Sequence, residues 1–409
     1  MPRIAPQLVR GALSHSPELA ALLPACRDLN SAFNELRWIR EHVDKTVKFN
    51  RKRHLERLCQ KRGRGVPLQY LLGTQPFGSL NIKCKPGVLI PRPETEAYAC
   101  HLQDLLEAGN LLGKKLSELG NLRIIDFCTG TGCIPLHLFS TLQRSVRSLE
   151  VCGVDISPVA LELARENARY NVAQGCMPSP SEKQAISFQK ADIFRDTDIQ
   201  QFTGLPWDVM TSNPPYISRN VWNYGWGQMG YSARKYEPRL ALVPEDDMPP
   251  APAGLLHEDV FYARLLDLAQ TLCPKILLME VGDESQARRI VQYCSRHIFC
   301  IKAQLTIWRD WPDVAPESDK NTEESDFTIY TNDGQRIKVP IKGSGNIRSI
   351  SKSEVRMLLN KQSRLDHVTL EIFHSNVKLR STTRAFYMVS FTACIGVAIP
   401  SLNPLMLCT

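Results

Sequence analysis

Residues 122–132 read LRIIDFCTGTG, an apolar run that ends in an aspartate and a glycine-rich turn. The run 122–127 predicts a buried strand, and residues from about 131 to 143 predict the helix that follows it. Gly130 and Gly132 let the backbone approach a ligand closely, where the amides at a helix start are free. A dinucleotide-binding turn needs a third glycine, and this chain has Pro135 in its place. The turn therefore suits a smaller adenosine ligand that carries no pyrophosphate.

The alternation of strand and helix continues along the chain. An amphipathic helix is predicted at 157–171, with Ser157 as its cap and Pro158 at its first position. Further strands are predicted at 150–155, 186–194, 207–212 and 275–282. Such alternation is typical of a parallel sheet covered by helices on both faces, so the expected fold class is α/β.

Two aspartates stand at the ends of predicted strands. Asp155, followed by Ile156, ends the second strand, where an acid can accept hydrogen bonds from both hydroxyls of a ribose. Asp192 ends the third, where it can accept from an adenine amino group while the amide of Ile193 reaches a ring nitrogen. Either aspartate alone could be a cap or a turn former. Parallel strands, however, bring their carboxyl ends to one crevice.

The fourth predicted strand leads into the tetrapeptide Asn213-Pro214-Pro215-Tyr216. Two prolines cannot continue a sheet ladder, and the residue before each proline is kept out of the helical region. The tetrapeptide is therefore a stiff, extended loop at a strand end. Open α/β sheets place their chemistry at such loops.

The chain has 409 residues, enough for more than one domain, and its net charge of +8 is unevenly distributed. Residues 1–70 hold 14 Lys and Arg against 6 Asp and Glu, so the surplus lies at the N-terminal end. This surplus favours contact with an acidic partner, such as nucleic acid, a ribosome or an acidic protein. A solvated helical surface would have the same composition.

Cysteine usage and the two chain ends bear on the compartment. The thirteen cysteines include no Cys-x-x-Cys pair, which favours neither a zinc site nor a disulfide framework and indicates a reducing compartment. Residues 1–17 contain two Arg, two Ser and no acid, as a mitochondrial presequence does. The uncharged end 385–409 is interrupted by Pro400 and Pro404, so we do not expect it to span a membrane.

The order of these motifs resembles class I S-adenosylmethionine-dependent methyltransferases that modify planar nitrogens. Four segments together resemble the HemK family, whose members methylate the glutamine of a Gly-Gly-Gln loop in peptide chain release factors: VPLQYLLG (66–73), IPRPETE (90–96), NPPYI (213–217) and EPRLAL (237–242). MEVG at 279–282 continues a match that covers roughly residues 18–315. The basic N-terminus and the insertions at 174–184, 245–253 and 315–326 resemble a fungal mitochondrial member.

The resemblance implies a seven-stranded, mostly parallel, Rossmann-like sheet with a helical domain and a hairpin linker. It divides the chain into a targeting segment (1–17), a helical substrate-recognition domain (18–72), a β-hairpin linker (73–97), a methyltransferase domain (98–350) and an extension of unknown role (351–409). It implies a monomer in the mitochondrial matrix, with the cytoplasm as the alternative. Its partner is a release factor, bound on or off the ribosome, without direct readout of nucleic acid.

The resemblance also implies the site. The cofactor is S-adenosylmethionine, its product is S-adenosylhomocysteine, and no metal is expected. The implied cofactor-binding residues are Asp126, Cys128, Thr129, Gly130, Thr131, Gly132, Asp155, Ile156, Asp192, Ile193 and Asn213. The implied catalytic residues are Asn213, Pro214 and Tyr216, and the substrate is bound by these residues with Pro215, Arg92 and Glu94.

The family chemistry gives these residues their roles. The Asn213 side-chain oxygen and the Pro214 carbonyl accept from the substrate NH2 group, and Tyr216 packs against its flat amide. Arg92 could equally form a structural pair with Glu94 or Glu96.

The sequence departs from the family at two cofactor positions. Cys128 stands where the family has glycine, and its side chain is expected to narrow the pocket. Ile193 stands where an aromatic residue often follows the aspartate, and this change is expected to weaken adenine stacking.

Two other functions stay open. An adenine-N6 methyltransferase acting on DNA or RNA would share NPPY, but it would need a target-recognition domain and leave IPRPETE unexplained. A binding module that has lost catalysis is the third reading.

Overall fold

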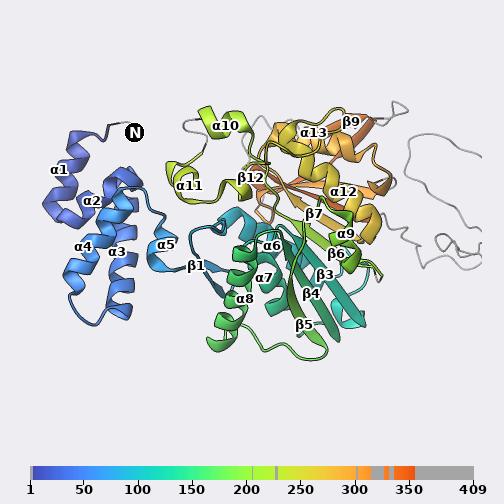
Figure 1. Cartoon of the computed structure of the whole chain (residues 1–409), viewed down its shortest axis with the longest axis horizontal. Helices are drawn as coiled ribbons and strands as arrows, with labels where there is room; N and C mark the ends of the chain where they lie inside the picture. The colour runs from blue at the N-terminus through green and yellow to red at the C-terminus, as the bar shows by residue number, and fades with distance from the viewer. Residues whose placement is uncertain are drawn as a thin grey trace, which may run out of the picture. The chain divides into compact units, whose positions relative to one another are not determined.

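A computed structural model describes residues 3–204, 206–225, 229–300, 303–314, 327–330 and 336–354 (Figure 1). The insertion predicted at 315–326 and the uncharged end at 385–409 lie outside these residues. Within the described part of the chain, no helix combines the length and the apolar character that crossing a bilayer requires.

The N-terminal residues fold as a bundle of helices with its own apolar core. Its elements are α1 (Pro6–His15), α2 (Pro17–Cys26), α3 (Leu29–Thr46), α4 (Arg51–Gly63) and α5 (Leu68–Leu72). The Ser16 and Asp28 side chains cap α2 and α3 by accepting from backbone amides three residues on. Ala12 of α1 is buried in this core, so the bundle begins near Pro6 and not at residue 18 as the sequence predicted. Residues 3–17, predicted as a targeting segment, are therefore part of a packed helical unit.

A hairpin follows the bundle, as predicted, but it is shorter than 73–97. It consists of β1 (Thr74–Phe77) and β2 (Leu80–Lys83), and helix α6 (Pro93–Glu107) already begins inside the predicted linker. Pro93 suits the first position of a helix, and Glu94 and Glu96 complement the positive end of the helix dipole. Glu96 also accepts from the Gly78 amide at 2.8 Å, which ties helix α6 to the hairpin.

One mixed sheet carries the site. Its strands are β3 (Asn121–Phe127), β4 (Ser148–Asp155), β5 (Gln184–Lys190), β6 (Val209–Ser212), β7 (Ile276–Glu280), β8 (Ala303–Trp311), β11 (Ile341–Lys342) and β12 (Ser344–Glu354), in the order β11-β8-β12-β7-β6-β3-β4-β5. Strands β3 to β7 run parallel, and β12 lies antiparallel between β7 and β8. The predicted α/β class, with a mostly parallel Rossmann-like sheet, is confirmed.

Two details of the sheet correct the prediction. The sheet has an eighth strand, because the two residues of β11 pair with β8 at its edge. Strand β12 runs to Glu354, so a domain boundary at residue 350 would fall inside a strand that pairs on both sides.

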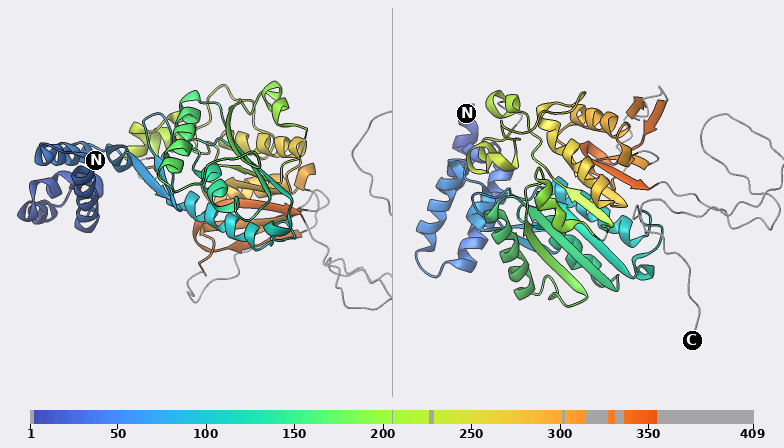
Figure 2. Two further views of the ribbon diagram at one scale, coloured as in Figure 1. Left: turned by 90° about the horizontal axis from the view of Figure 1, so that it is seen from below. Right: turned by 45° about the vertical axis from the view of Figure 1, so that its right-hand side comes forward.

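Helices cover both faces of the sheet (Figures 1 and 2). On one face α6, α7 (Cys133–Leu142) and α8 (Pro158–Ala173) share an apolar cluster with Ile124 of β3 and Val209 of β6. On the other face α12 (Val260–Leu272) and α13 (Glu284–Cys294) pack with Ile125 and Met210, the next residues along the same strands. Because neighbouring residues of a strand point to opposite faces, these strands are apolar on both sides, as the continuous apolar runs predicted.

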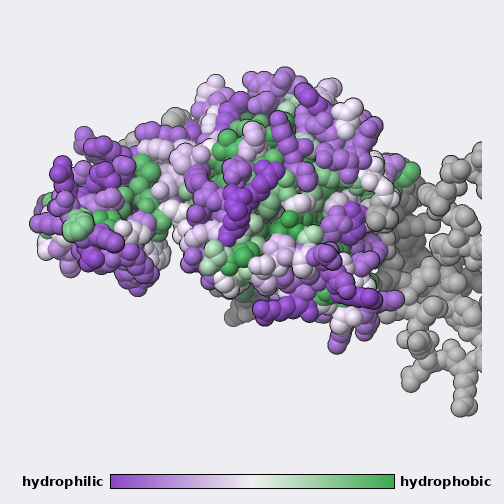
Figure 3. Space-filling view, turned by 60° about the horizontal axis from the view of Figure 1, so that its bottom comes forward, coloured by the Kyte–Doolittle hydropathy of each residue, from purple (hydrophilic) through white to green (hydrophobic). Residues whose placement is uncertain are grey.

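Short elements and loops complete the described chain. They are α9 (Asp196–Ile199), α10 (Arg219–Tyr224), α11 (Tyr231–Tyr236), the pair β9 (Phe327–Tyr330) and β10 (Arg336–Val339), and the 3-10 turns η1 (Leu116–Glu118), η2 (Gln200–Phe202), η3 (Arg239–Ala241), η4 (His257–Asp259) and η5 (Ile298–Cys300). The visible surface in Figure 3 is mostly hydrophilic, with smaller hydrophobic areas between the polar residues.

Candidate active site

The carboxyl ends of β3, β4 and β5 surround a cavity of about 340 Å³, which we call the smaller cavity. Nine of the predicted cofactor residues line it: Cys128, Thr129, Gly130, Thr131, Asp155, Ile156, Asp192, Ile193 and Asn213. The sequence thus predicted correctly that residues from four separate strand ends lie together. The volume falls in the range of small-molecule sites.

Asp155 holds the glycine turn as well as lining the cavity. Its Oδ2 accepts from the Gly130 amide at 2.8 Å and its Oδ1 from the Ser157 amide at 2.8 Å. Burial raises the pKa of Asp155, and these backbone hydrogen bonds oppose the rise. The carboxylate therefore fixes the loop that follows β3 against the end of β4.

Aromatic side chains line the smaller cavity near Asp192, although Ile193 follows that aspartate. Phe194 and Phe261 both line it and pack edge to face, with ring centroids 5.1 Å apart. Asp192 Oδ1 accepts from the Phe194 amide at 3.0 Å, which closes this turn. The cavity therefore has aromatic groups one position after Ile193 and on α12, which the sequence did not indicate. The weaker adenine stacking expected from Ile193 stays a prediction.

Two predicted cofactor residues do not line the cavity. Asp126 is 1% exposed, and its Oδ1 accepts from the Thr211 hydroxyl at 2.6 Å. A Cβ on Gly132 would meet Ala164 and Phe188 at 3.0 Å, so this glycine serves close packing of helix α8 against the turn. Asp126 and Gly132 therefore support the loop that follows β3 through contacts outside the cavity.

Cys128 adopts a left-handed backbone conformation with φ of 60°. Glycine adopts this region without strain, which gives a physical reason for the glycine that the family carries at this position. The Cys128 side chain packs against the core, and Cys128 also lines the smaller cavity. That this side chain narrows the pocket stays a prediction.

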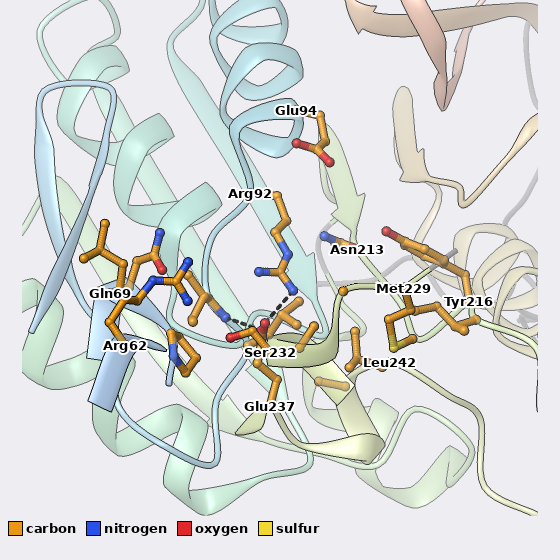
Figure 4. Close-up of a pocket in the computed structure, with 18 residues that line it drawn as sticks. Arg62, Gln69, Arg92, Glu94, Asn213, Tyr216, Met229, Ser232, Glu237 and Leu242 are labelled. Atoms are coloured by element: carbon orange, nitrogen blue, oxygen red, sulfur yellow. Dashed lines mark hydrogen bonds and ion pairs between the residues drawn. The ribbon is translucent and has the colours of Figure 1, made fainter. Parts of the chain in front are cut away.

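A larger cavity of about 460 Å³ lies against the smaller one. Arg62, Pro67, Leu68 and Gln69, at the end of α4 and the start of α5, line it together with residues of the α11 region, including Met229 and Ser232 (Figure 4). Both cavities are lined by Leu89, Ile90, Arg92, Asn213 and Ala241. Asn213 therefore lies where the two cavities meet.

The four residues of the NPPY loop face different surroundings. Asn213 lines both cavities, Pro215 the smaller and Tyr216 the larger, whereas the buried Pro214 lines neither. The Tyr216 hydroxyl donates to Glu280 Oε1 at 3.1 Å, and its carbonyl accepts from Gln286 Nε2 at 3.2 Å. The loop is thus anchored to β7 and α13.

Arg92 both lines the cavities and forms an ion pair. Its Nη2 lies 2.8 Å from Oε1 of Glu237, and Glu237 Oε2 accepts from the Ile90 amide at 3.0 Å (Figure 4). The partner is therefore Glu237 of EPRLAL, and not Glu94, which lines the larger cavity, or Glu96, which holds the hairpin. The ion pair joins two of the segments that carried the family resemblance.

Sequence reasoning missed the role of the 245–253 segment, which it took for a surface insertion. Glu245, Asp247, Met248 and Pro249 line the smaller cavity. Asp246 does not line this cavity, and it pairs with Arg219 at 2.8 Å and with Arg239 at 3.3 Å. The acidic and proline-rich composition gave no signal of this position, because only tertiary contacts bring the segment to the strand ends.

Comparison with curated proteins identifies the family. The chain is 36% identical over 247 residues to the mitochondrial MRF1 N(5)-glutamine methyltransferase MTQ1 of Saccharomyces cerevisiae, covering 60% of this chain and 69% of that protein. It is 35% identical over 243 residues to the probable mitochondrial MRF1 enzyme of Schizosaccharomyces pombe, covering 58% of this chain and 72% of that protein. The chain belongs to the release factor glutamine methyltransferase family. The predicted HemK resemblance is confirmed, and the chain is an S-adenosylmethionine-dependent methyltransferase.

Other comparisons are more distant. A bacterial release factor glutamine methyltransferase, from Chlorobaculum tepidum, is 35% identical over 185 residues, or 45% of this chain and 55% of its own. Among solved structures, the N-terminal domain of human METTL16 with SAH covers 79% of this chain and 95% of its own at 12% identity and a TM-score of 0.40. No family model matches the chain.

Proposed function

We propose that this chain transfers a methyl group from S-adenosylmethionine to the side-chain amide nitrogen of the glutamine in the Gly-Gly-Gln motif of a mitochondrial peptide chain release factor. The observation that carries the proposal is the position of Asn213, which lines both the smaller and the larger cavity. A donor in one cavity and an amide in the other would meet at this side chain.

The smaller cavity suits the adenosine part of the cofactor. Asp155 offers carboxylate oxygens to ribose hydroxyls, Asp192 lies at the next strand end, and Phe194 and Phe261 offer flat apolar surface to a base. The cofactor supplies, when bound, a methyl group on a positively charged sulfur. No metal ligand is part of this proposal. Among the described residues, no three His, Cys, Asp or Glu side chains are grouped to bind an ion.

The chain's task at the reacting centre is to hold an amide nitrogen. Such a nitrogen is a poor nucleophile because its lone pair is delocalised into the carbonyl group. The Asn213 side-chain oxygen can accept one N–H of the substrate amide, which fixes the nitrogen and stabilises the positive charge that develops on it. The same role for the Pro214 carbonyl stays a prediction, because Pro214 lines neither cavity.

The larger cavity is the proposed entry of the glutamine loop. Arg62 and Gln69 bring the helical bundle to its wall, so a release factor held by the bundle could reach Asn213 directly. We propose that the enzyme acts as a monomer in the mitochondrial matrix, on or off the ribosome, and without direct readout of nucleic acid. The mitochondrial location is supported by the two yeast relatives, which are named as mitochondrial enzymes.

A methyl-transfer assay tests the proposal. The full chain receives radiolabelled S-adenosylmethionine with a mitochondrial release factor, with the same factor carrying Gly-Gly-Ala in place of Gly-Gly-Gln, and with adenine-containing DNA and RNA. We expect label on the intact factor alone. Label on nucleic acid would replace the proposed substrate by the adenine-N6 alternative. Absence of label everywhere, with S-adenosylhomocysteine still raising the melting temperature, would support a non-catalytic binding module.

A further inference from the structure

Three side chains from distant parts of the chain form a hydrogen-bonded series behind the NPPY loop. Asn213 Nδ2 donates to Thr95 Oγ1 at 3.4 Å, and the Thr95 hydroxyl donates to Glu280 Oε2 at 2.7 Å. Thr95 lies in the first turn of α6 and Glu280 at the end of β7, and they are 2% and 0% exposed. The Thr95–Glu280 hydrogen bond is therefore shielded from bulk water, whereas Asn213 at the other end of the series lines both cavities.

The chemistry of these groups gives the series a direction. The Thr95 hydroxyl donates its single proton to Glu280 Oε2, so this proton is not available to Asn213. The Thr95 oxygen then presents only lone pairs to Asn213, and only the NH2 side of the amide can meet it. The Asn213 Oδ1 must therefore point away from Thr95, on the side of the amide that is free to face a substrate.

Glu280 also holds the other end of the loop. Its second oxygen, Oε1, accepts from the Tyr216 hydroxyl at 3.1 Å. The backbone carbonyl of Glu280 accepts from the Tyr262 hydroxyl at 2.7 Å, which anchors this residue to α12. One buried carboxylate thus fixes both the first and the last side chain of Asn213-Pro214-Pro215-Tyr216.

We propose that Thr95 and Glu280 are positioning residues that set the flip state of the Asn213 amide, so that Oδ1 and not Nδ2 meets the substrate amide. The proposal rests on the proposed function, because it assigns Asn213 the role of acceptor. An amide turned by 180° would present a donor to the substrate NH2 group, and the two donors would repel each other. Most of the residues that line the two cavities are not part of this series, so we expect the binding of cofactor and of release factor to change less than the rate of methyl transfer.

Four variants separate positioning from packing. Thr95→Val keeps the shape and removes the hydroxyl, whereas Thr95→Ser keeps the hydroxyl. Glu280→Gln replaces the carboxyl group that accepts from Thr95 and Tyr216 by an amide, one side of which donates. Thr211→Val is the matched control, because the Thr211 hydroxyl also donates to a buried carboxylate, Asp126, but no hydrogen bond joins it to Asn213.

We expect Thr95→Val and Glu280→Gln to lower kcat about 10-fold to 100-fold, with KM for both substrates changed by less than about threefold. Thr95→Ser is expected to retain kcat within about threefold of the wild type. Thr211→Val is expected to lower the melting temperature while leaving kcat within the same limits. Wild-type kcat in a folded Thr95→Val protein would overturn the proposal. So would equal damage by Thr95→Ser and Thr95→Val, which would indicate a role in shape alone.

An NMR measurement tests the orientation without any methyl transfer. In wild-type protein the side-chain amide protons of Asn213, assigned by comparison with Asn213→Ala, should give cross-peaks to Thr95, and Glu280→Gln should weaken them. Absence of these cross-peaks in the wild type would overturn the proposal. Their presence in a protein that methylates no release factor would support the orientation and contradict only the proposed function.

Discussion

Asp126 is a buried carboxyl group whose ionisation should govern stability near neutral pH. Burial raises its pKa to about 7, although the hydrogen bond from Thr211 opposes the rise. The unfolded chain has an ordinary pKa of about 3.9 for aspartate. Since the pKa of Asp126 is higher in the folded protein than in the unfolded chain, protonated Asp126 contributes to the free energy of unfolding. This contribution is fully present below about pH 4 and is lost as the pH rises through about 7.

Asp126→Asn should remove this pH dependence. We expect the free energy of unfolding of the wild type, relative to the variant, to fall by about 3 kcal/mol between pH 4 and pH 7 and to level off about one pH unit above that. Urea titrations of both proteins at several pH values measure the difference, in which the groups common to both cancel. A difference that is independent of pH would mean that Asp126 is ionised throughout.

Arg92 and Glu237 connect the start of α6 to the segment that follows α11. The Glu237 side chain is 3% exposed, so removing Arg92 leaves a buried charge without its cation. We expect Arg92→Gln to cost roughly 2–4 kcal/mol of unfolding free energy, and the double variant Arg92→Gln/Glu237→Gln to recover most of it. Methyl transfer should stay impaired in both, because Arg92 also lines both cavities.

The exposed pair Arg169–Glu162 supplies the control for this prediction. Both side chains are largely exposed, so Arg169→Gln should change the unfolding free energy by less than about 1 kcal/mol. Chemical unfolding curves of the four proteins suffice. Equal stability of Arg92→Gln and the wild type would show that Glu237 does not need this cation.

Elements whose apolar pattern is local were predictable from the sequence, and elements defined by distant partners were not. The strands β3 to β7 were predicted because each contains a short run with apolar residues that leads to a Gly, Asp or Asn. Strand β12 was missed because its buried residues include Ser349, Ser351 and Lys352, and its neighbours β7 and β8 bury them.

In the site, the positions of Asp155, Asp192 and the NPPY loop could be predicted, because each comes at the end of a predicted strand. The hydrogen bond between Thr95 and Glu280 could not be predicted, because the two residues are 185 positions apart in the sequence.

At the scale of the whole molecule, the charge surplus of residues 1–70 can be tested at the start of α4. Lys52 and Arg53 are exposed in its first turn, where cations oppose the helix dipole, and Phe49 just before them is 82% exposed. Exposed cations at an unfavourable helix position, beside an exposed ring, fit our proposal that the bundle holds the release factor. This observation supports the bundle as the contact for an acidic face of the protein substrate.

Lys52→Gln/Arg53→Gln should raise KM for the release factor at least about threefold at low salt, with less effect at high salt, while kcat and melting temperature stay near wild type. Steady-state kinetics at two ionic strengths measure this. The matched control is Lys114→Gln/Lys115→Gln, which removes two exposed cations outside the bundle. An equal effect of both pairs would reduce the role of the bundle to general net charge.

The central claim is that methyl transfer occurs at Asn213, where the two cavities meet. The most direct measurement is single-turnover methyl transfer to the release factor by wild type and Asn213→Ala, with the affinity for S-adenosylhomocysteine measured on the same samples. The account predicts a rate reduced at least about 100-fold and a dissociation constant changed only a few-fold, because an acceptor in the transition state is lost while the cofactor pocket remains. A variant that transfers methyl groups near the wild-type rate would contradict the account.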